Sequence, residues 1–382
     1  MRIAYVINSL EGGGAAAPVP VVAQVLRDQG AEVEVFALIR RDGRALAAME
    51  AAGLKVHVRD GGEKDHLGAL AWLDRRIAAF EPDLIWTSLT RATLLGQLVG
   101  LRRRLPVVSW QHAAFLKPAN RILLRATQRL SQLWIGDSNN VTCLTARRLG
   151  VPPDRLTTWP LFSASGETAC ARSWRPGEVV EVGSLGRLHR VKGYDVLIDA
   201  LAILEESGFA PPAPFRIRIA GDGAQREALE TRIAEAGLDN VQLIGFCDRP
   251  RDFLSGLHLY VQPSRSEGLC IAAHEAMEAG LPTIVSAVGE MPFSVLDGRT
   301  GLVVDPEDPE ALAEALKRLL SHPDALATMG AASRARVLDR FGAAAFARTG
   351  AEIVARLPLT RARSRGRGRR RSPARLASGR SA

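Results

Sequence analysis

The stretch LHLYVQPSRSEGLCIAAHEAMEAGLPTIVSA, residues 257–287, contains one complete strand–helix–strand unit. Its first apolar run ends at Pro263, which has no backbone N–H to donate to a neighbouring strand. We expect a helix to begin near Leu269 and to end at Gly280 and Pro282, before a second apolar run starts. Two successive strands joined by a helix typically run parallel in one sheet. The stretch therefore predicts a parallel sheet with a polar loop at the carboxyl end of a strand.

The same alternation of short apolar runs and helical segments extends over the 382 residues of the chain. Strands are predicted at 2–8, 32–38, 55–58, 83–87, 106–110, 133–138, 155–159, 179–185, 215–220, 241–245, 257–262 and 282–287. Helical segments are predicted at 66–80, 138–149, 309–320, 324–340 and, as AAAFARTGAEIVARL, 343–357. Residues 161–178 are small and polar and are predicted to link two domains. Two successive α/β units on either side of this linker predict two Rossmann-like halves.

The basic charge of the chain is concentrated in the Arg/Ser/Gly-rich tail, residues 359–382. The net charge is +9, and removing the nine arginines of 361–382 from the 50 Lys and Arg residues leaves 41, equal to the 41 Asp and Glu residues. Such a tail has little to bury, so we expect it to be disordered. It is either a solvated extension or a contact for anionic lipid headgroups. Nucleic acid is the least favoured partner, because the tail has no aromatic residues and we expect no basic groove on the folded body.

Several classes of protein are not indicated by this composition. No apolar run approaches the ~20 residues of a membrane helix, and MRIAYVINSL at the start predicts a first strand rather than a signal peptide. The four cysteines, at 143, 170, 247 and 270, form no CxxC pair and predict a reducing compartment. There is no Asp-x-Asp pair and no His/Cys cluster with metal-ligand spacing, so we expect neither a metal nor another cofactor. We therefore expect a cytoplasmic protein, with peripheral contact to the inner face of the cell membrane as the open alternative.

Two glutamates flank the helix start in the opening stretch. Glu267 precedes the predicted helix and Glu275 lies about two turns inside it. The free N–H groups of Gly268, Leu269 and Cys270 can hold an anion at the helix start. A carboxylate such as Glu275 can accept hydrogen bonds from two neighbouring hydroxyl groups, as a ribose offers. The alternative is that both acids only stabilise the helix dipole, which explains Glu267 better than Glu275.

A second loop carries positive charge. Arg187 and Lys192, in SLGRLHRVKGYDVLIDAL, follow a predicted strand and precede a helix. There they can neutralise a diphosphate, or they can be two solvated surface charges. His112 follows the strand at 106–110, and a structural and a catalytic role both remain open.

The first predicted strand is followed by a glycine run, which lets the backbone approach an anion or forms a plain turn. Its members are Gly12, Gly13 and Gly14. The run is not GxGxxG, and no acidic residue stands in clear register after the second strand, so a dinucleotide site is only weakly indicated.

Taken together, five segments resemble the retaining glycosyltransferases of family 4. In chain order they are GSLGRLHRVKGYDVLIDAL, IAGDGAQREALE, NVQLIGFCDR, PSRSEGLCIAAHEAMEAGLPTIVS and GRTGLVVDPED, and the fourth carries the E-x7-E signature. The resemblance covers about residues 1–357 and is strongest over 183–305. It implies an α/β protein of the GT-B fold, in which two Rossmann-like domains with parallel sheets face each other across a cleft. Residues 1–165, with 343–358 as a returning helix, would bind the acceptor, and residues 178–342 the nucleotide sugar.

The resemblance also implies roles for the candidate residues. A hexosyl group would pass from a UDP or GDP donor to a glycan or lipid-linked acceptor, with retention of configuration, without a metal, and in cell-surface polysaccharide or glycolipid synthesis. Glu267 and His112 would face the donor sugar as the catalytic pair, and Glu275 would bind the ribose. Arg187, Lys192 and the N–H groups of residues 268–270 would stabilise the leaving diphosphate. A GT-B nucleotide-sugar 2-epimerase and a non-catalytic sugar-nucleotide-binding protein are the alternatives.

The chain departs from the family pattern in several places. The glycine loop lacks the acid and the base that commonly follow the paired glycines, and TTWPLFSAS lacks the expected Pro-Asn-Gly. In VGEMPFSVLDG, Glu290 stands where a second glycine is usual and Phe293 where an acid is usual. These departures concern the specificity for acceptor and sugar more than the fold.

One further segment suggests a membrane contact. ANRILLRATQRLSQLW, residues 119–134, is predicted to be a helix with Arg121, Arg125 and Arg129 on one face. A basic amphipathic helix can lie on an anionic membrane. The alternative is a surface helix that packs its leucines inward.

Overall fold

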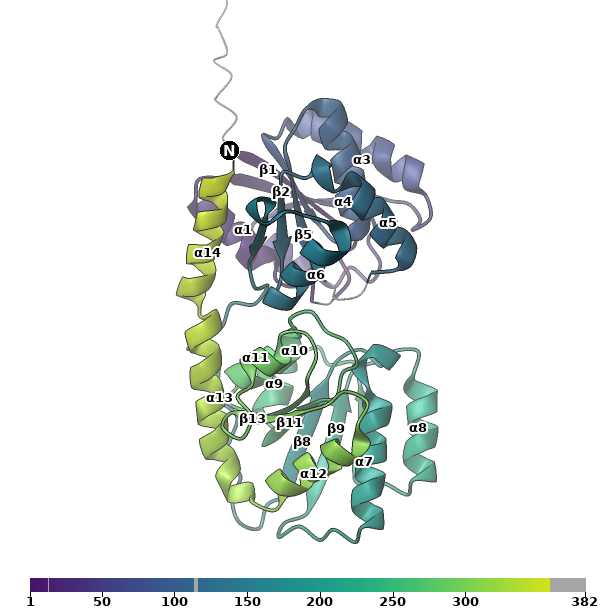
Figure 1. Cartoon of the computed structure of the whole chain (residues 1–382), viewed down its shortest axis with the longest axis vertical. Coiled ribbons are helices and arrows are strands. Elements are labelled where there is room, and N and C mark those ends of the chain that lie inside the picture. The colour runs from purple at the N-terminus through teal and green to yellow at the C-terminus, as the bar shows by residue number, and fades with distance from the viewer. Residues whose placement is uncertain (13, 113–115, 358–382) are drawn as a thin grey trace, which may run out of the picture.

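The computed structural model describes residues 1–12, 14–112 and 116–357. Within these residues the chain forms two parallel sheets, one in each of two domains that lie end to end, with a helical column along one side (Figure 1). No helix in this part of the chain combines the length and the hydropathy needed to cross a lipid bilayer. Gly13 and the tail at 359–382 lie outside the described residues.

The N-terminal domain has a seven-stranded parallel sheet with the order β3-β2-β1-β4-β5-β6-β7. Its strands are β1 (Arg2–Ile7), β2 (Glu32–Ala37), β3 (Lys55–Val58), β4 (Leu84–Ser88), β5 (Val107–Gln111), β6 (Leu133–Gly136) and β7 (Leu156–Thr158). Its helices are α1 (Val19–Asp28), α2 (Leu46–Ala51), α3 (His66–Phe80), α4 (Thr90–Arg103), α5 (Pro118–Thr127) and α6 (Asn139–Leu149). All seven strands predicted for this half are confirmed. The strand order reverses between β1 and β4, which is where doubly wound sheets bind their ligands.

The C-terminal domain repeats this plan with six strands in the order β10-β9-β8-β11-β12-β13. Its strands are β8 (Val180–Leu185), β9 (Phe215–Ala220), β10 (Val241–Gly245), β11 (Leu259–Gln262), β12 (Thr283–Ser286) and β13 (Gly301–Val304). Its helices are α7 (Tyr194–Glu206), α8 (Arg226–Glu235), α9 (Pro250–Ser255), α10 (Ile271–Glu278), α11 (Met291–Ser294), α12 (Pro309–Leu320) and α13 (Leu326–Phe341). The short edge strand β13 was not predicted, because four residues after a glycine carry little periodic signal. The α/β prediction with two Rossmann-like domains is confirmed.

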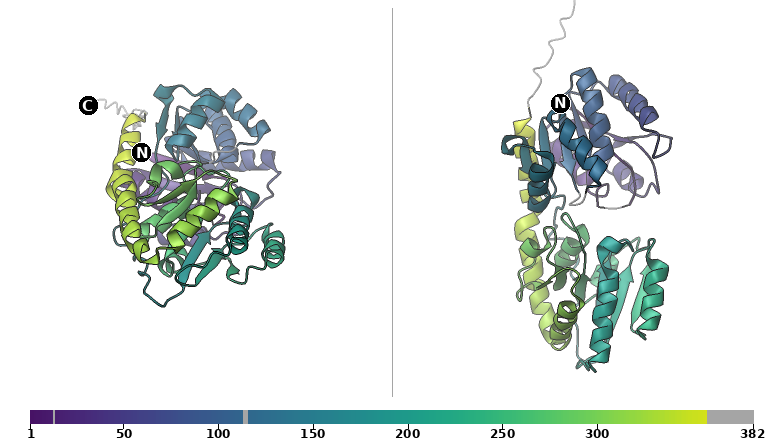
Figure 2. Two further views of the ribbon diagram at one scale, coloured as in Figure 1. Left: turned by 60° about the horizontal axis from the view of Figure 1, so that its bottom comes forward. Right: turned by 45° about the vertical axis from the view of Figure 1, so that its right-hand side comes forward.

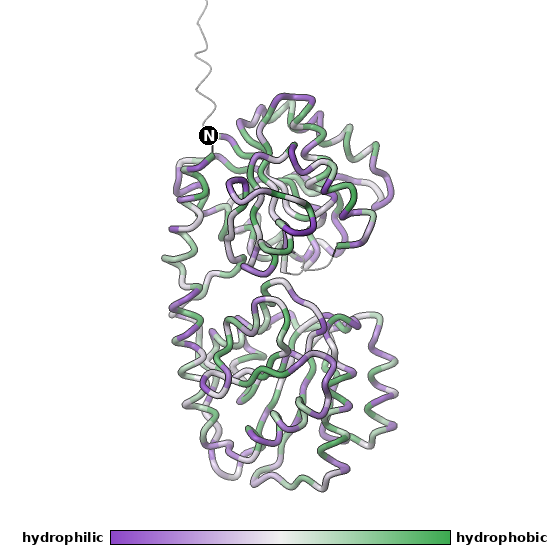
Figure 3. The backbone as a smooth tube through the Cα atoms, in the orientation of Figure 1, coloured by the Kyte–Doolittle hydropathy of each residue, from purple (hydrophilic) through white to green (hydrophobic). Residues whose placement is uncertain are grey.

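Both faces of the N-terminal sheet are buried. Along β1, Ile3, Tyr5 and Ile7 belong to one apolar cluster, and Ala4 and Val6 belong to another. This two-residue alternation with apolar residues on both sides is what a parallel sheet covered by two helix layers requires. Along the backbone tube, the apolar colour is concentrated on the strands and on the inward sides of the helices (Figure 3).

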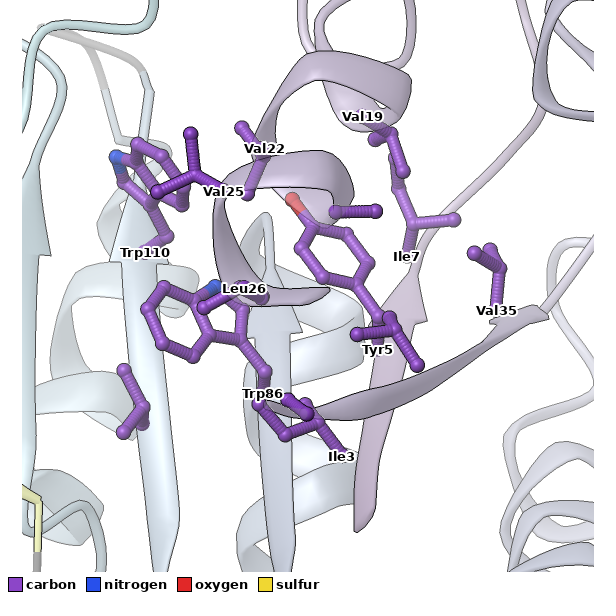
Figure 4. Packing of buried hydrophobic residues seen from close by; sticks show 14 of the residues in the cluster. Ile3, Tyr5, Ile7, Val19, Val22, Val25, Leu26, Val35, Trp86 and Trp110 are labelled. Atoms are coloured by element: carbon purple, nitrogen blue, oxygen red, sulfur yellow. The ribbon is translucent and has the colours of Figure 1, made fainter. Parts of the chain in front are cut away.

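Tryptophans and one tyrosine fill the core beneath α1 (Figure 4). The rings of Trp110 and Trp159 stack with centroids 4.8 Å apart, and Trp86 meets Trp110 edge-on at 5.9 Å. The last helix, α14 (Ala343–Arg356), joins this cluster through Phe346, whose carbonyl accepts a hydrogen bond of 3.1 Å from Trp159 Nε1. A helix that follows the C-terminal domain is thus packed into the core of the N-terminal domain.

The chain crosses between the domains twice, and the two crossings are joined. Ala164, in the linker, donates its N–H to the carbonyl of Phe341 at 2.7 Å. In return, the N–H of Ala343 donates to the carbonyl of Ala164 at 3.1 Å. Figures 1 and 2 show α13 beside the C-terminal domain and α14 beside the N-terminal domain, with the junction between them at this point. The two crossing segments are therefore fixed to each other where they pass between the domains.

The predicted helix at 119–134 is wrong beyond Thr127. The helix α5 ends there, a 3₁₀ turn covers Gln128–Leu130, and Trp134 lies in β6. The run LWIG pairs with β5 on one side and β7 on the other, so sheet formation overrides the helical pattern. Arg121 and Arg125 remain on α5, whereas Arg129 lies in the 3₁₀ turn.

Candidate active site

Two charged loops of the C-terminal domain are fixed to each other at the carboxyl edge of its sheet. They are the loop between β8 and α7 and the loop between β11 and α10. The N–H of Arg265 donates to the carbonyl of Val191 at 2.8 Å, and its guanidinium forms two hydrogen bonds, of 2.7 and 2.8 Å, with Asp195. Gly193 has a φ of +67°, and a Cβ there would lie 2.0 Å from the carbonyl oxygen of Pro263. Only glycine lets the two loops approach this closely.

The joined loops bring Lys192 and Glu267 together. Lys192 Nζ donates to Glu267 Oε1 at 2.7 Å, and Ser264 Oγ donates to the same oxygen at 2.7 Å. Behind Ser264, Gln262 Nε2 donates to Ser264 Oγ at 2.9 Å, and the Tyr260 hydroxyl donates to Gln262 Oε1 at 2.7 Å. Glu267 is therefore held by a chain of hydrogen bonds that reaches back into β11.

The ion pair keeps Lys192 charged although the pair is largely buried. The side chain of Lys192 is 21% exposed and that of Glu267 is 11% exposed. Burial by itself lowers the pKa of Lys192, but the nearby carboxylate of Glu267 outweighs burial and raises this pKa. An ammonium group has three donors, so one bond to Glu267 leaves two for a ligand. The prediction assigned the two residues to different parts of a ligand, and the structure shows that they form one unit.

The helix α10 begins at Ile271, two residues later than predicted, with Cys270 before it in the left-handed region at φ +66°. This conformation is costly for a residue with a side chain, and such strain clusters at functional sites. Within the described residues, the N–H groups of Gly268, Leu269 and Cys270 donate no hydrogen bond. Burial raises the pKa of the Cys270 thiol to about 12, so it stays protonated. The predicted anion-binding turn is thus present, with its donors unused.

Two other predicted residues lie on the same domain without joining this pair. Arg187 is exposed in the loop after β8 and forms no ion pair within the described residues. Glu275 lies in the second turn of α10, and its carboxyl group makes no hydrogen bond in the part of the chain that the structure describes. Burial, and then the charge of Glu278, raise the pKa of Glu275 to about 7.

On the N-terminal domain, His112 follows β5 and is buried. Its Nε2 lies 2.6 Å from Ser88 Oγ, and burial lowers its pKa to about 3, so the imidazole is neutral. Asp137, which follows β6, lies beside it, with Oδ2 3.9 Å from His112 Nδ1. Burial, then the charges of Glu290 and Glu267, raise the pKa of Asp137.

The two domains touch where these groups face each other. A Cβ on Gly268 would lie 2.7 Å from the carbonyl oxygen of His112 and 3.2 Å from both carboxyl oxygens of Asp137. A Cβ on Gly14 would lie 3.4 Å from Ile271, so the glycine loop meets the start of α10. The structure therefore brings His112, the 268–270 turn and the glycine loop to one junction.

Gly12, another member of the glycine loop, bonds within the N-terminal domain and not across the junction. The N–H of Gly12 donates to Asp42 at 3.1 Å, so this group serves a turn of the N-terminal domain. Next to that turn, the guanidinium of Arg44 lies 3.5 Å from the ring centroid of Phe246, a cation–π contact between the domains. Gly13 lies outside the described residues.

Glu290, one of the departures from the family pattern, joins the two domains. Its side chain is 2% exposed; Oε2 accepts the N–H of Asn139 at 3.1 Å, and Oε1 accepts from Arg340 at 2.9 Å. Asn139 is the first residue of α6, where a carboxylate is favoured by the helix dipole. Phe293, where an acid is usual in the family pattern, is 59% exposed.

Sequence reasoning assigned no role to four residues that shape the site, although it noted Glu290 as a departure from the family pattern. They are Asp137, Ser264, Arg265 and Glu290. The position of Asp137, directly after β6, was a usable signal, because ligand-binding residues follow strands at this edge of a sheet. The partners of Arg265 and Glu290 are distant in sequence, whereas Ser264 bonds to Gln262 and Glu267, two and three residues away. Across residues 1–12, 14–112 and 116–357, no group of three or more His, Cys, Asp or Glu side chains could hold a metal ion.

Comparison with known proteins agrees with this arrangement. The family described as Glycosyltransferase Family 4 matches residues 12–162, and the family described as Glycosyl transferases group 1 matches residues 172–336. The D-inositol 3-phosphate glycosyltransferase of Streptomyces scabiei is 28% identical over 386 residues, which cover 87% of this chain and 84% of the relative. The corresponding protein of Streptomyces coelicolor is 31% identical over 232 residues, 57% of this chain and 44% of the relative.

Solved structures show the same fold. Anabaena HepE in complex with UDP-glucose matches with a TM-score of 0.80 at 22% identity, covering 94% of this chain and 100% of HepE. Sucrose-phosphate synthase from Thermosynechococcus elongatus matches with a TM-score of 0.73 at 20% identity, over 93% and 98% of the two chains. The chain is a glycosyltransferase with the GT-B fold. It belongs to glycosyltransferase family 4, as its five sequence segments predicted.

Proposed function

We propose that this glycosyltransferase moves a hexosyl group from a UDP or GDP donor to a glycan or lipid-linked acceptor, without a metal and with retention of configuration. The observation that carries the proposal is the buried Lys192–Glu267 pair beside the unused N–H groups of residues 268–270. It combines a fixed positive charge, helix-start donors and a carboxylate at one sheet edge, as an anionic leaving group and a sugar together require.

The roles follow from this arrangement. Lys192 and the turn N–H groups stabilise the charge that develops on the diphosphate as its bond to the anomeric carbon breaks, and the exposed Arg187 adds a second cation. The new bond forms to the acceptor oxygen, whose proton is lost. Glu267 Oε1 is occupied by Lys192 and Ser264, so its other oxygen is the one available to a sugar hydroxyl. Glu275 accepts from the ribose hydroxyls, and His112 approaches the sugar from the acceptor-binding N-terminal domain.

The known proteins suggest where to begin. HepE was solved with UDP and with UDP-glucose, which makes uridine nucleotides the first donors to examine. The Streptomyces relatives are named for D-inositol 3-phosphate, a phosphorylated acceptor. A role in cell-surface polysaccharide or glycolipid synthesis is the wider setting that we propose.

The test uses the full chain with UDP-, GDP- and ADP-sugars, with and without a chelator. Thermal stabilisation by one sugar nucleotide is expected; none with any of them overturns the proposal, and loss on chelation overturns the metal-independent part. Nucleotide release that needs an acceptor distinguishes transfer from 2-epimerisation. If the unchanged protein binds a sugar nucleotide but shows no donor turnover, so that Glu267→Ala and His112→Ala have none to lose, a non-catalytic binding protein is indicated. The anomeric configuration of the product, measured by NMR, tests retention.

We also propose contact with an anionic membrane, based on a basic groove in the N-terminal domain. The groove, of about 470 Å³, is lined by Arg121, Ile122, Arg125, Leu144, Arg147 and Arg148 of α5 and α6. The expectation that the folded body carries no basic groove is therefore wrong. Residues 84–153 contain ten Lys and Arg residues and a single acid, the buried Asp137. Ile122 and Leu123, on the same helix α5, are 65% and 50% exposed.

This combination of apolar and cationic side chains favours a lipid surface, since each basic residue contributes about 1 kcal/mol near anionic headgroups. Co-sedimentation with vesicles of phosphatidylglycerol and phosphatidylcholine measures the contact. Arg121→Glu with Arg125→Glu should abolish binding to the anionic vesicles at low salt. The matched change Lys317→Glu with Arg318→Glu, on α12 of the other domain, should not. Deleting 361–382 tests the tail separately, and equal binding by all variants overturns the proposal.

A further inference from the structure

Two neighbouring polar atoms on the N-terminal side of the domain junction are buried without a partner. His112 Nδ1 and Asp137 Oδ1 make no hydrogen bond within the described residues, although both side chains are only 6% exposed. Buried polar groups are nearly always hydrogen-bonded in folded proteins, so unpartnered ones call for a missing water, ion or ligand. Asp137 has no assigned role in the reaction so far.

The sheet explains why these two side chains meet. β5 and β6 are parallel neighbours, with Gln111 paired to Gly136, and the N–H of Asp137 donates to the carbonyl of Gln111 at 3.1 Å. His112 and Asp137 are the next residues along each strand, so they leave the sheet side by side at its carboxyl edge. The carboxyl group of Asp137 and the backbone carbonyl of His112 face Gly268 of the other domain, which has no side chain.

The charges around Asp137 favour its neutral form. The carboxylates of Glu267 and Glu290 raise its pKa in addition to burial. The cations nearby are engaged elsewhere, since Lys192 is paired with Glu267 and Arg340 with Glu290. A neutral carboxyl group offers one O–H donor and one carbonyl acceptor. It is thus suited to a neutral polyol rather than to a cation.

We infer that Asp137 is a further donor-sugar contact, which together with His112 holds one hydroxyl of the transferred sugar and helps to select that sugar. With Nε2–H donating to Ser88 Oγ, His112 Nδ1 accepts the sugar O–H, and Asp137 donates its own O–H to the same sugar oxygen. The 3.9 Å between His112 Nδ1 and Asp137 Oδ2 allows one sugar oxygen to lie about 2.8 Å from both, with the donated O–H on Oδ2. Asp137 Oδ1, which is unpartnered within the described residues, is then free to accept a hydrogen bond from the sugar. Because the domains touch at this point, the sugar reaches the pair only when they separate. The inference rests on the proposed function.

The decisive comparison is between UDP and UDP-sugars. Asp137→Ala should leave the affinity for UDP within about twofold, because UDP carries no sugar, and weaken binding of the preferred UDP-sugar about tenfold. It should also reduce the preference between UDP-glucose and its epimer UDP-galactose in kcat/KM. Asp137→Asn, which keeps a donor and an acceptor, should retain most of both properties. Asp83→Ala, at the opposite edge of the N-terminal sheet, is the matched control and should change neither.

Two outcomes overturn the inference. Equal weakening of UDP and UDP-sugar binding would mean that Asp137 only shapes the junction, and unchanged sugar preference in both variants would mean that it does not touch the sugar. If Asp137→Ala does not fold, Asp137→Leu, which is similar in shape but has neither donor nor acceptor, decides the question by the same comparison of UDP with UDP-sugars. Failure of the unchanged protein to bind any sugar nucleotide contradicts the proposed function instead, and is seen before any variant is made.

Discussion

The two sides of the domain junction are built in opposite ways. On the C-terminal side, Glu267 is held by Lys192 and Ser264, and the chain of hydrogen bonds continues to Tyr260. On the N-terminal side, His112 and Asp137 each keep a buried atom that has no partner among the residues that the structure describes. Charge on a leaving diphosphate is best stabilised by groups that are in place beforehand, whereas neutral hydroxyl groups can be met by neutral donors and acceptors. The difference indicates that the hydrogen bonds of the anion-binding, C-terminal side are formed before the ligand binds. Those of the sugar-binding, N-terminal side are formed only with the ligand.

Removing Lys192 disrupts the anion-binding, C-terminal side of the junction and should have the largest effect on kcat/KM. Lys192→Ala takes away the cation and leaves the largely buried Glu267 unpaired, so kcat/KM should fall about 10³-fold. Steady-state kinetics measure this. Glu267→Gln alone should also be severe, and the double variant should lose much less than the product of the two effects, because the pair acts as one unit. Independent, multiplicative losses would contradict the pairing.

The contact that holds the two sides together is tested at Glu290. Glu290→Ala removes the ion-pair partner of Arg340, which keeps its hydrogen bond to the Phe293 carbonyl, and the acceptor for the N–H of Asn139. The free energy of unfolding should therefore fall by roughly 3 kcal/mol. Urea denaturation measures this loss. A loss smaller than that of an exposed ion pair would show that Glu290 does not join the domains.

The pH dependence of donor binding tests the role of Glu275, which lies on the C-terminal, anion-binding side of the junction. Its pKa of about 7 means that the carboxyl group is mainly neutral at pH 6 and mainly ionised at pH 8. Because a carboxylate accepts from a ribose diol better than a carboxylic acid does, affinity for a UDP-sugar should rise about tenfold over this range. Isothermal titration calorimetry of the Glu275→Gln variant should show no such rise.

The same group has a consequence for stability. The folded-state pKa of Glu275 is raised above the ordinary value of 4.5, so ionisation is less favourable in the folded protein than in the unfolded chain. Its contribution to the free energy of unfolding therefore decreases as pH rises from 4.5 to about 7. Glu275→Gln should remove that decrease, and an identical pH profile for both proteins would contradict the assignment.

The smallest change in the free energy of unfolding is expected at Glu307, which lies on the surface of the C-terminal domain. Its ion pair with Arg265 has a 60% exposed carboxylate, so Glu307→Ala should cost no more than about 1 kcal/mol. Arg265 keeps its two bonds to Asp195 in this variant. If Glu307→Ala lowered the free energy of unfolding as much as Glu290→Ala does, burial would not be what makes the Glu290 ion pair the stronger of the two.

Some features of the candidate site could be predicted from the local sequence pattern alone. The strand–loop–helix order around 257–287 placed Glu267 before the helix and left the N–H groups of Gly268 to Cys270 unused, because strand ends and helix starts have the same unpaired groups in every parallel sheet. The start of α10 was predicted two residues too early, since the left-handed Cys270 leaves no trace in residue type. The helix at 119–134 was predicted too long because its helical spacing runs into the strand predicted at 133–138, which the structure shows as β6 between β5 and β7.

By itself, the sequence determined the two α/β domains, the balanced charge of the folded body, the family and the loops that carry charge. Those properties depend on periodicity and on motifs that are local along the chain. Only the tertiary structure decided that Lys192 pairs with Glu267, that Glu290 binds Asn139 across the junction, and that Asp137 lies beside His112, with its Oδ1 unpartnered among the described residues. These contacts join residues up to 151 positions apart, and their energies depend on distance and burial, which no local pattern specifies.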